Sequence, residues 1–458
     1  MKYQINIKPV KNVLLILIGL FFLQVCNGQK DKWSLERCIS YAKENNLQIK
    51  QLSYDAEIAE TNLNTAKNAY LPKLNAGIDE RYHIDRTSNA YSGGSSNNNR
   101  HNGNVSVNAG IDIFQGLQRR NNVKAKIFSL KAVLLDIEEA KNNLSLNITS
   151  IFLDLLFYDE LIKSYTVQLI ETKEKVSMAK EIVGSGVKTD SYLYDFLAQE
   201  AQDSVNLVMA KNDYQTSLID LIQLLDIREP AGFEIMKPDN LSSLNASISS
   251  VDEYYDIALK TLPQLRSSQF RKERAKLNKK YIEGNKYPSL SFETYLGSNY
   301  SSNSTLFNSM GEPADYPYFN QLDDNINMYF GLNLRIPIFN RFTVRNSLSI
   351  AKIDISKSEN NHEIIKQQIF KEVQKAYYDV ISAREKMKSM KVLKDAMDVS
   401  YNHANEKLRA GVISIYDFNT VMTRYSNATS DYLQSKYEYV FKLKILDFYA
   451  GIPLSFDN

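Results

Sequence analysis

Hydrophobic residues recur at every third or fourth position along two long stretches of the chain. In the first stretch, from Leu144 to Val183, the steps alternate four, three, four, three, and no proline or glycine interrupts them. The positions are Leu144, Ile148, Ile151, Leu155, Tyr158, Ile162, Tyr165, Leu169, Thr172, Val176, Ala179 and Val183. A mean period of about 3.5 residues keeps one face of a helix against a partner helix. The pattern therefore predicts a long helix that packs in a bundle.

The same pattern returns 225 residues later, with Lys394 as the one break in its apolar character. Its positions are Ile369, Val373, Ala376, Val380, Ala383, Met387, Met390, Lys394, Met397, Tyr401, Ala404 and Leu408. Nearer the N-terminus, matched residues recur at an offset of 216: Ala42, Gln48, Ala59 and Pro72 return as Ala258, Gln264, Ala275 and Pro288. The sequence thus predicts that one structural unit is duplicated.

After each of these prolines the pattern changes from helical spacing to alternation. One strand of the first copy carries Val105, Val107, Ala109, Ile111 and Ile113 on its apolar face, and the last strand of the second copy carries Ile326, Met328, Phe330, Leu332, Leu334, Ile336 and Ile338. Polar, often small residues fill the other face. Polar loops are expected at residues 82–103 and 297–325. Each copy therefore contributes a predicted β-hairpin with one apolar and one polar face.

Two interpretations of these hairpins are open. An ordinary sheet would pack its apolar face on a core, whereas a transmembrane barrel would turn that face to lipid. The barrel is favoured, because the rest of the chain is self-paired helix and polar loop. Val107, Ile111, Leu332 and Ile336 would then face lipid.

Four strands are too few to close a barrel, since the smallest closed barrels need about eight. A dimer would fill its interior with side chains, whereas a trimer of about twelve strands leaves a water-filled lumen. The expected fold is therefore a trimeric membrane α/β channel-tunnel. A helix over residues 117–183 would be roughly 100 Å long at about 1.5 Å per residue, enough to continue the barrel as a coiled-coil tube through the periplasm.

The N-terminus has the pattern of an export signal. Lys2, Lys8 and Lys11 precede an apolar core at residues 13–23, and polar residues follow at once. Such a core is short for a membrane span and typical of a cleaved signal peptide, here residues 1–28. Lipidation of Cys26 is the alternative, although Val25 stands where a small residue is expected.

The remaining chain divides into two repeats joined by a linker. The first covers residues 29–228, with its β-hairpin at about 73–114 and a long helical hairpin at about 115–228. Residues 229–250, which contain two prolines and a serine-rich run, are expected to form the linker. The second covers residues 251–458, with its β-hairpin at about 289–338 and its helical hairpin at about 339–452.

Composition and motifs exclude several function classes. A net charge of +2 gives no basic field for nucleic acid. The histidines at 83, 101, 362 and 403 lack paired ligand spacing and are expected to be solvated. Residues 184–189 resemble a phosphate-binding loop, but they follow a helix where a strand is required. No nucleophile and base can be paired, so neither enzymatic activity nor a cofactor or metal is expected.

Several motifs, duplicated and in order, resemble the TolC-type outer-membrane efflux protein family. They are Trp33–Glu36, residues 42–46, Tyr70–Leu74 with its copy Tyr287–Leu290, the strand exit Ile336–Phe339 and the two glycine turns. The resemblance covers essentially the whole mature chain. It implies a homotrimeric outer-membrane channel that serves as the exit duct of an efflux or secretion system. Its helical part would lie in the periplasm and dock a periplasmic adaptor (membrane fusion) protein and an inner-membrane transporter.

The resemblance also implies a gate at the periplasmic tip. Asp417 matches the gate-lining aspartate; Tyr192 is its first-copy equivalent, with Asp190 and Asp195 nearby. The family's tethering arginine and tyrosine are replaced here by Ile413 and Leu408. A carboxylate at the start of a helix, stabilised by the helix dipole, is the alternative role for Asp417.

The two tip turns are expected to dock the adaptor. Their residues are Gly184 and Gly186 with the helix cap Thr189, and Gly411 with the helix cap Ser414. A soluble periplasmic coiled-coil scaffold, whose hairpins pair with protein instead of lipid, is the alternative function.

Overall fold

In this computed structural model, residues 32–88, 95–228, 232–238 and 249–456 are described. The predicted signal peptide and Cys26 lie outside these ranges. The chain forms two compact units. Unit 1 contains the described residues up to Gln51, Ile137–Leu262 and those from Lys366 onward, and unit 2 contains Leu52–Asp136 and Pro263–Ile365.

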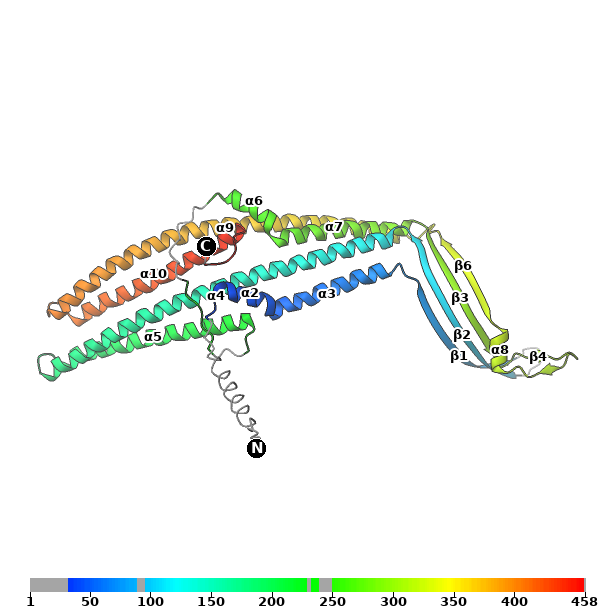
Figure 1. Cartoon of the computed structure of the whole chain (residues 1–458), viewed down its shortest axis with the longest axis horizontal. Helices are drawn as coiled ribbons and strands as arrows, with labels where there is room; N and C mark the ends of the chain where they lie inside the picture. The colour runs from blue at the N-terminus through cyan, green and yellow to red at the C-terminus, as the bar shows by residue number, and fades with distance from the viewer. Residues whose placement is uncertain (1–31, 89–94, 229–231, 239–248, 457–458) are drawn as a thin grey trace, which may run out of the picture. The chain divides into compact units, whose positions relative to one another are not determined.

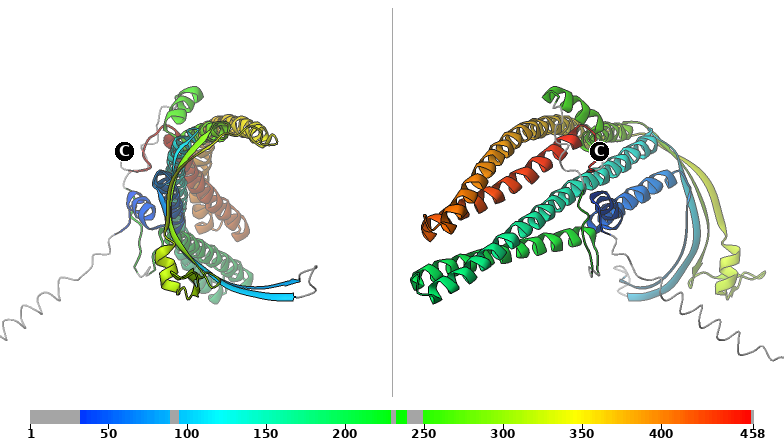
Figure 2. Two further views of the ribbon diagram at one scale, coloured as in Figure 1. Left: turned by 90° about the vertical axis from the view of Figure 1, so that its right-hand side faces the viewer. Right: turned by 60° about the vertical axis from the view of Figure 1, so that its left-hand side comes forward.

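Unit 2 is built around a curved antiparallel sheet, visible edge-on in Figure 2. Its strands are β1 (Lys73–Ser88), β2 (Ser95–Gln115), β3 (Ser289–Ser301) and β6 (Asn327–Arg335), in the order β1-β2-β3-β6. The two hairpins meet where β2 pairs with β3, so one sheet contains both copies (Figure 1). The expected four strands per chain are confirmed.

The register places the apolar residues of the four strands on one face. Ala76 pairs with Val107, Val107 with Leu296, and Leu296 with Met328. A bulge between Asp112 and Phe114 leaves Ile113 out of the register, and Phe114 pairs with Leu290 instead. The alternation predicted through Ile113 is therefore wrong by one residue, because an extra residue in one strand shifts the faces.

The hairpin ends are more regular than their composition suggests. The loop predicted at residues 82–103 is largely strand, since β1 pairs with β2 as far as Ser88 opposite Ser95. The loop predicted at 297–325 contains the end of β3, the short strands β4 (Leu306–Phe307) and β5 (Pro313–Ala314), and helix α8 (Tyr318–Asp324). Backbone hydrogen bonds hold such strands whether or not the side chains are apolar.

Long helices complete unit 2 next to the sheet. They are α7 (Pro263–Glu283), followed by the 3-10 turn η1 (Gly284–Lys286), most of α3 (Leu47–Asn68), and the first turns of α4 (Gln118–Gly184) and α9 (Thr343–Arg409). His362 on α9 is buried, and its Nδ1 lies 2.7 Å from the Ser268 hydroxyl of α7. The expectation that this histidine is solvated is therefore wrong, because α7 covers it.

Unit 1 is helical. It contains α2 (Leu35–Asn45), α5 (Asp190–Leu225), α6 (Val251–Thr261) and α10 (Ile415–Tyr449), with the greater part of α4 and α9. Helices α4 and α5 form one antiparallel hairpin and α9 and α10 another (Figure 1). None of the 24 positions of the two predicted heptad patterns is exposed, Lys394 included. The predicted helix-packing faces are confirmed.

Helix boundaries repeat at the predicted offsets. The offset of 216 separates Leu35 from Val251 at the starts of α2 and α6, and Leu47 from Pro263 at the starts of α3 and α7. The offset of 225 separates Gln118 from Thr343 at the starts of α4 and α9. In the region predicted as a linker, Ile235 forms a parallel bridge with Trp33.

Within the described part of the chain, no helix is both long and apolar enough to cross a membrane.

Candidate functional site

Each long helix ends in the same glycine turn. Gly186 (φ 76°) and Gly411 (φ 72°) adopt the left-handed conformation. The Val187 amide donates to the Ile182 carbonyl over 3.2 Å, and the Val412 amide donates to the Lys407 carbonyl over 2.9 Å. These are Schellman motifs, in which glycine avoids the strain that a Cβ would add. Both tips thus have the same backbone architecture, and Gly184 is the last helical residue before the first of them.

The returning helices begin differently in the two copies. Both Thr189 and Ser414 occupy the N-cap position, as predicted, but only Ser414 forms a side-chain cap. Its hydroxyl accepts from the Asp417 amide over 3.1 Å and donates to the Asp417 carboxylate over 2.7 Å. Asp417 is exposed in the first turn of α10, where the helix dipole stabilises a carboxylate.

The first-copy gate candidates occupy two environments. Asp190 is exposed at the first position of α5. Tyr192 is half-buried against a cluster of Val176, Ala179, Phe196 and Ile415, in which Ile415 comes from the second hairpin. The backbone carbonyl of Asp195 accepts from the Asn419 side chain over 3.5 Å. Tyr192 and Asp195 therefore lie where the two helical hairpins meet.

Leu408 and Ile413, which stand at the family's tethering positions by the resemblance, take part in apolar packing. Leu408 packs against the cluster around Val176 and also against a second cluster of Tyr401, Ala404, Phe418 and Met422. Ile413 packs on the second cluster. The residues at the family's tethering positions are therefore part of the hydrophobic contact near the tips.

A polar cluster that sequence reasoning missed joins the same two hairpins; Tyr401 and Lys175 in it are buried, and Glu171 is exposed. The Tyr401 hydroxyl donates to the Glu171 carboxylate over 2.7 Å and accepts from the Lys175 ammonium, 3.1 Å away. The Lys175 ammonium lies 4.5 Å from the ring centroid of Phe418. Burial lowers the pKa of Lys175, and the Glu171 carboxylate opposes that shift. The available signal was Tyr401, the single hydroxyl-bearing residue of the second heptad pattern, since a buried hydroxyl needs a partner.

Glu171, Lys175 and Tyr401 line a cavity of about 470 Å³ between the hairpins. Its wall also includes Tyr192, Leu408 and Arg409. The cavity is lined by both charged and aromatic side chains from the two hairpins.

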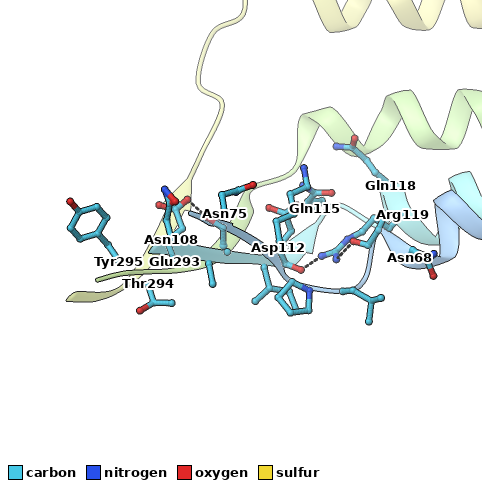
Figure 3. Close-up of a pocket in the computed structure, with 18 of the residues that line it drawn as sticks. Asn68, Asn75, Asn108, Asp112, Gln115, Gln118, Arg119, Glu293, Thr294 and Tyr295 are labelled. Carbon is cyan, nitrogen blue, oxygen red and sulfur yellow. Dashed lines mark hydrogen bonds between the residues drawn. The ribbon is translucent and has the colours of Figure 1, made fainter. Parts of the chain in front are cut away.

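The polar face of the sheet forms a second hollow, within unit 2. Asn75, Asn108, Tyr295 and Tyr329 follow one another across the four strands in register. They line a cavity of about 650 Å³ together with Asp112, Glu293 and Arg119. Figure 3 shows Arg119 beside Asp112, whose carbonyl accepts from the guanidinium, and a second bond of 3.1 Å reaches the Ala69 carbonyl. This face is suited to contact with water and polar solutes.

The opposite face carries the predicted lipid contacts. Val107 and Leu332 are exposed on it, and Ile111, which is half-buried, shares it. Ile336 is exposed but follows the last residue of β6, because Pro337 cannot continue the hydrogen-bond ladder. An exposed apolar face of this extent is typical of contact with another surface.

Comparisons with known proteins agree with this fold. The family described as outer membrane efflux protein matches residues 38–226 and 254–451. The structure is similar to the CmeC outer membrane channel of Campylobacter jejuni, with 19% identity over 93% of this chain and 88% of that chain and a TM-score of 0.75.

Two further solved structures are similar. The outer membrane protein VceC of Vibrio cholerae has 13% identity over 91% of this chain and 96% of that chain, with a TM-score of 0.72. The MtrE outer membrane channel of Neisseria gonorrhoeae has 16% identity over 92% of this chain and 90% of that chain, with a TM-score of 0.67. No curated protein matches the chain.

The four-stranded sheet with long helices and the duplicated family match define an outer membrane channel. The chain belongs to the outer membrane efflux protein family. It is an outer membrane efflux channel of the type used by tripartite efflux systems, with its helical part in the periplasm. Members of this family transport rather than catalyse, and membership decides against a soluble scaffold.

Proposed function

We propose that three copies of this chain close one twelve-stranded barrel and form the passive exit duct of an efflux or secretion system. The observation that carries the proposal is the open sheet: among the described strands, β1 pairs only with β2 and β6 only with β3. Lipid does not tolerate open edges. Three such sheets in a ring would turn their polar faces to a lumen and their apolar faces to lipid. Export would use the signal peptide proposed at residues 1–28.

The tips are the proposed docking site for a periplasmic adaptor protein, which would link the duct to an inner-membrane transporter. Val187 and Val412, next to the two tip glycines, are 70% and 76% exposed. Tyr194 near the start of α5 and Tyr416 near the start of α10 are also exposed. Val187 and Val412 occupy equivalent places in the two copies, and their exposure supports a partner surface. Gly184, Gly186, Thr189, Gly411 and Ser414 shape that surface.

The gate would lie at the same tips, with Asp417, Asp190, Tyr192 and Asp195 around the passage. The contacts between the hairpins support a closed state in this conformation. Opening would separate the two hairpins and break the bond between Tyr401 and Glu171, which joins them. Energy for transport would come from the inner-membrane transporter, because the duct itself has no proposed chemistry.

The subunit number tests the barrel. The mass of the purified protein in detergent, measured by light scattering with the detergent subtracted, is expected to correspond to three chains. A folded monomer would overturn the proposal, since its sheet edges would then be stable when open.

Single-channel recording tests the gate. Asp417→Ala is expected to weaken block of the channel by multivalent cations added to the periplasmic side, because one carboxylate per subunit is lost from the passage. Asp431→Ala, on the exposed side of α10 further from the tip, is the matched control and should leave block unchanged. Unchanged block in Asp417→Ala would leave only the helix-start role for this residue.

A further inference from the structure

Helix α8 is firmly attached to the end of β3. The Ser298 hydroxyl donates to the Leu322 backbone carbonyl over 2.6 Å, and the Asn325 side-chain amide donates to the Asn299 backbone carbonyl over 2.9 Å. Gln321 is 1% exposed, and its side-chain oxygen Oε1 accepts from the Ser301 backbone amide over 2.9 Å. Figure 1 shows α8 against the end of the sheet that lies away from α7. The segment is therefore a fixed part of the sheet surface.

The register shows which face α8 covers. Ser298 pairs with Val105, and Val105 pairs with Ile78. Paired residues point to the same side of a sheet. Helix α8 therefore lies on the apolar face, the side that carries Ile78, Val105 and Val107, and not over the polar face.

A polar clasp on that same face holds α8 to the first hairpin. Glu80 continues the apolar row of Leu74, Ala76 and Ile78. The Tyr318 hydroxyl donates to one Glu80 oxygen over 2.9 Å, and His101 Nε2 lies 2.9 Å from the other. The Glu80 side chain lies over Gly103, where any Cβ would collide with it. The Glu80 carboxylate lies on an apolar face, where it has room because Gly103 has no side chain. Tyr318 and His101 are its polar partners there.

The position of α8 along the strands matches the height of a membrane. The apolar band of an outer-membrane barrel is about 25 Å tall, and tilted strands rising about 3.4 Å per residue cross it in about ten residues. Counted from Ser289, where β3 begins, ten residues end at Ser298, which is where α8 is attached. Aromatic residues gather at such membrane–water interfaces. Next to Tyr318 lies Phe319, which is 79% exposed.

We propose that α8 is a lipid-interface element that lies on the outside of the barrel at the outer leaflet, with the Phe319 ring inserted between lipid molecules. The occupant of this surface is the outer-leaflet lipid, because α8 is continuous with the apolar face of the strands. The proposal rests on the barrel proposed above. The Glu80–His101–Tyr318 clasp keeps the element at the level of the headgroups.

Depth-dependent fluorescence quenching tests this placement in the full-length protein reconstituted into phosphatidylcholine vesicles. The chain has one tryptophan, so Trp33→Phe provides a background without indole. Phe319→Trp is made in that background, and the vesicles contain lipid brominated either near the headgroup or at the end of the acyl chain. We expect the fluorescence of Phe319→Trp to fall, and to fall more with lipid brominated near the headgroup than with lipid brominated at the end of the acyl chain.

Two matched variants separate the possible failures. Leu332→Trp, on the apolar face of β6, reports on the barrel and should be quenched, more strongly by the deeper bromine. Met310→Trp, an exposed apolar residue beyond the strand ends, should be quenched little. Quenching of Leu332→Trp without quenching of Phe319→Trp would overturn the α8 proposal and leave the barrel proposal intact. Equal quenching of Met310→Trp and Phe319→Trp would also overturn the α8 proposal alone. No quenching at either 319 or 332 would overturn both.

Discussion

At the level of single residues, the two copies of the repeat have diverged at the start of the returning helix. Ser414 caps α10 through its hydroxyl, whereas Thr189 forms no side-chain cap for α5. Ser414→Ala should therefore destabilise the first turn of α10 by about 1 kcal/mol, the usual loss when a cap is removed. Thr189→Ala should have a much smaller effect on α5. Hydrogen exchange of the two first turns measures both, and equal effects would contradict the assignment.

The buried lysine predicts a dependence of stability on pH. The folded-state pKa of Lys175 lies below its ordinary value of 10.5, so the unfolded chain binds more protons at pH values between the two. Stability should therefore rise with pH through that window and stop rising near the unfolded pKa. Lys175→Met fills similar space without a charge and should have a smaller slope.

The measurement is the thermal unfolding midpoint of the detergent-solubilised protein from about pH 7 to about pH 9, where ordinary tyrosines, with a pKa of about 10, remain largely protonated. Lys371→Met, at an exposed position of α9, is the matched control and should keep the wild-type slope. Identical slopes in all three proteins would show that Lys175 does not titrate in this window.

Sequence alone could not assemble this cluster. Glu171 and Lys175 are 230 and 226 residues from Tyr401, and a heptad pattern says which face is buried without saying which polar residue on the partner helix lies opposite. The resemblance to the family singles out Asp417, whereas the hydrogen bond that makes it part of a helix cap is visible only in the structure.

At the level of elements, periodicity located the helices and strands well where each has a buried or apolar face. The starts of α4 and α9 and the two tip turns follow directly from the repeat. The hairpin ends were missed because Ser and Asn at residues 95–99 carry no alternation, although backbone pairing continues there. Helix α8 was missed because seven residues are too short for a helical period to be recognised.

The two faces of β2 predict opposite responses to charge. Val107→Arg places a charge on the apolar face and should cost about 2–4 kcal/mol if that position lies near the bilayer midplane. Ser106→Arg, one residue away, points to the polar face and should be tolerated. The amount of heat-resistant, correctly assembled protein in outer-membrane fractions measures the difference. Equal assembly of the two variants would mean that the apolar face does not contact lipid.

At the level of the whole molecule, duplication explains why one chain is structurally incomplete. Each copy supplies one β-hairpin and one helical hairpin, and the hairpins of the two copies pair through β2 and β3. The result is one sheet with two edges rather than a closed ring. The sequence could predict four strands and the need for partners, but the order of the strands required the register.

Closure of the barrel by three copies makes a prediction about those edges. Alternate backbone amides of β1 point away from β2 and have no partner strand within the described chain. In the assembled barrel they should bond to β6 of a neighbouring copy, so peptides covering residues 73–84 and 327–335 should exchange hydrogen as slowly as those from β2 and β3. In an assembly with open edges, β1 and β6 would exchange far faster than the two central strands. Because β2 and β3 are paired on both sides within one chain, they serve as the internal control in the same exchange experiment.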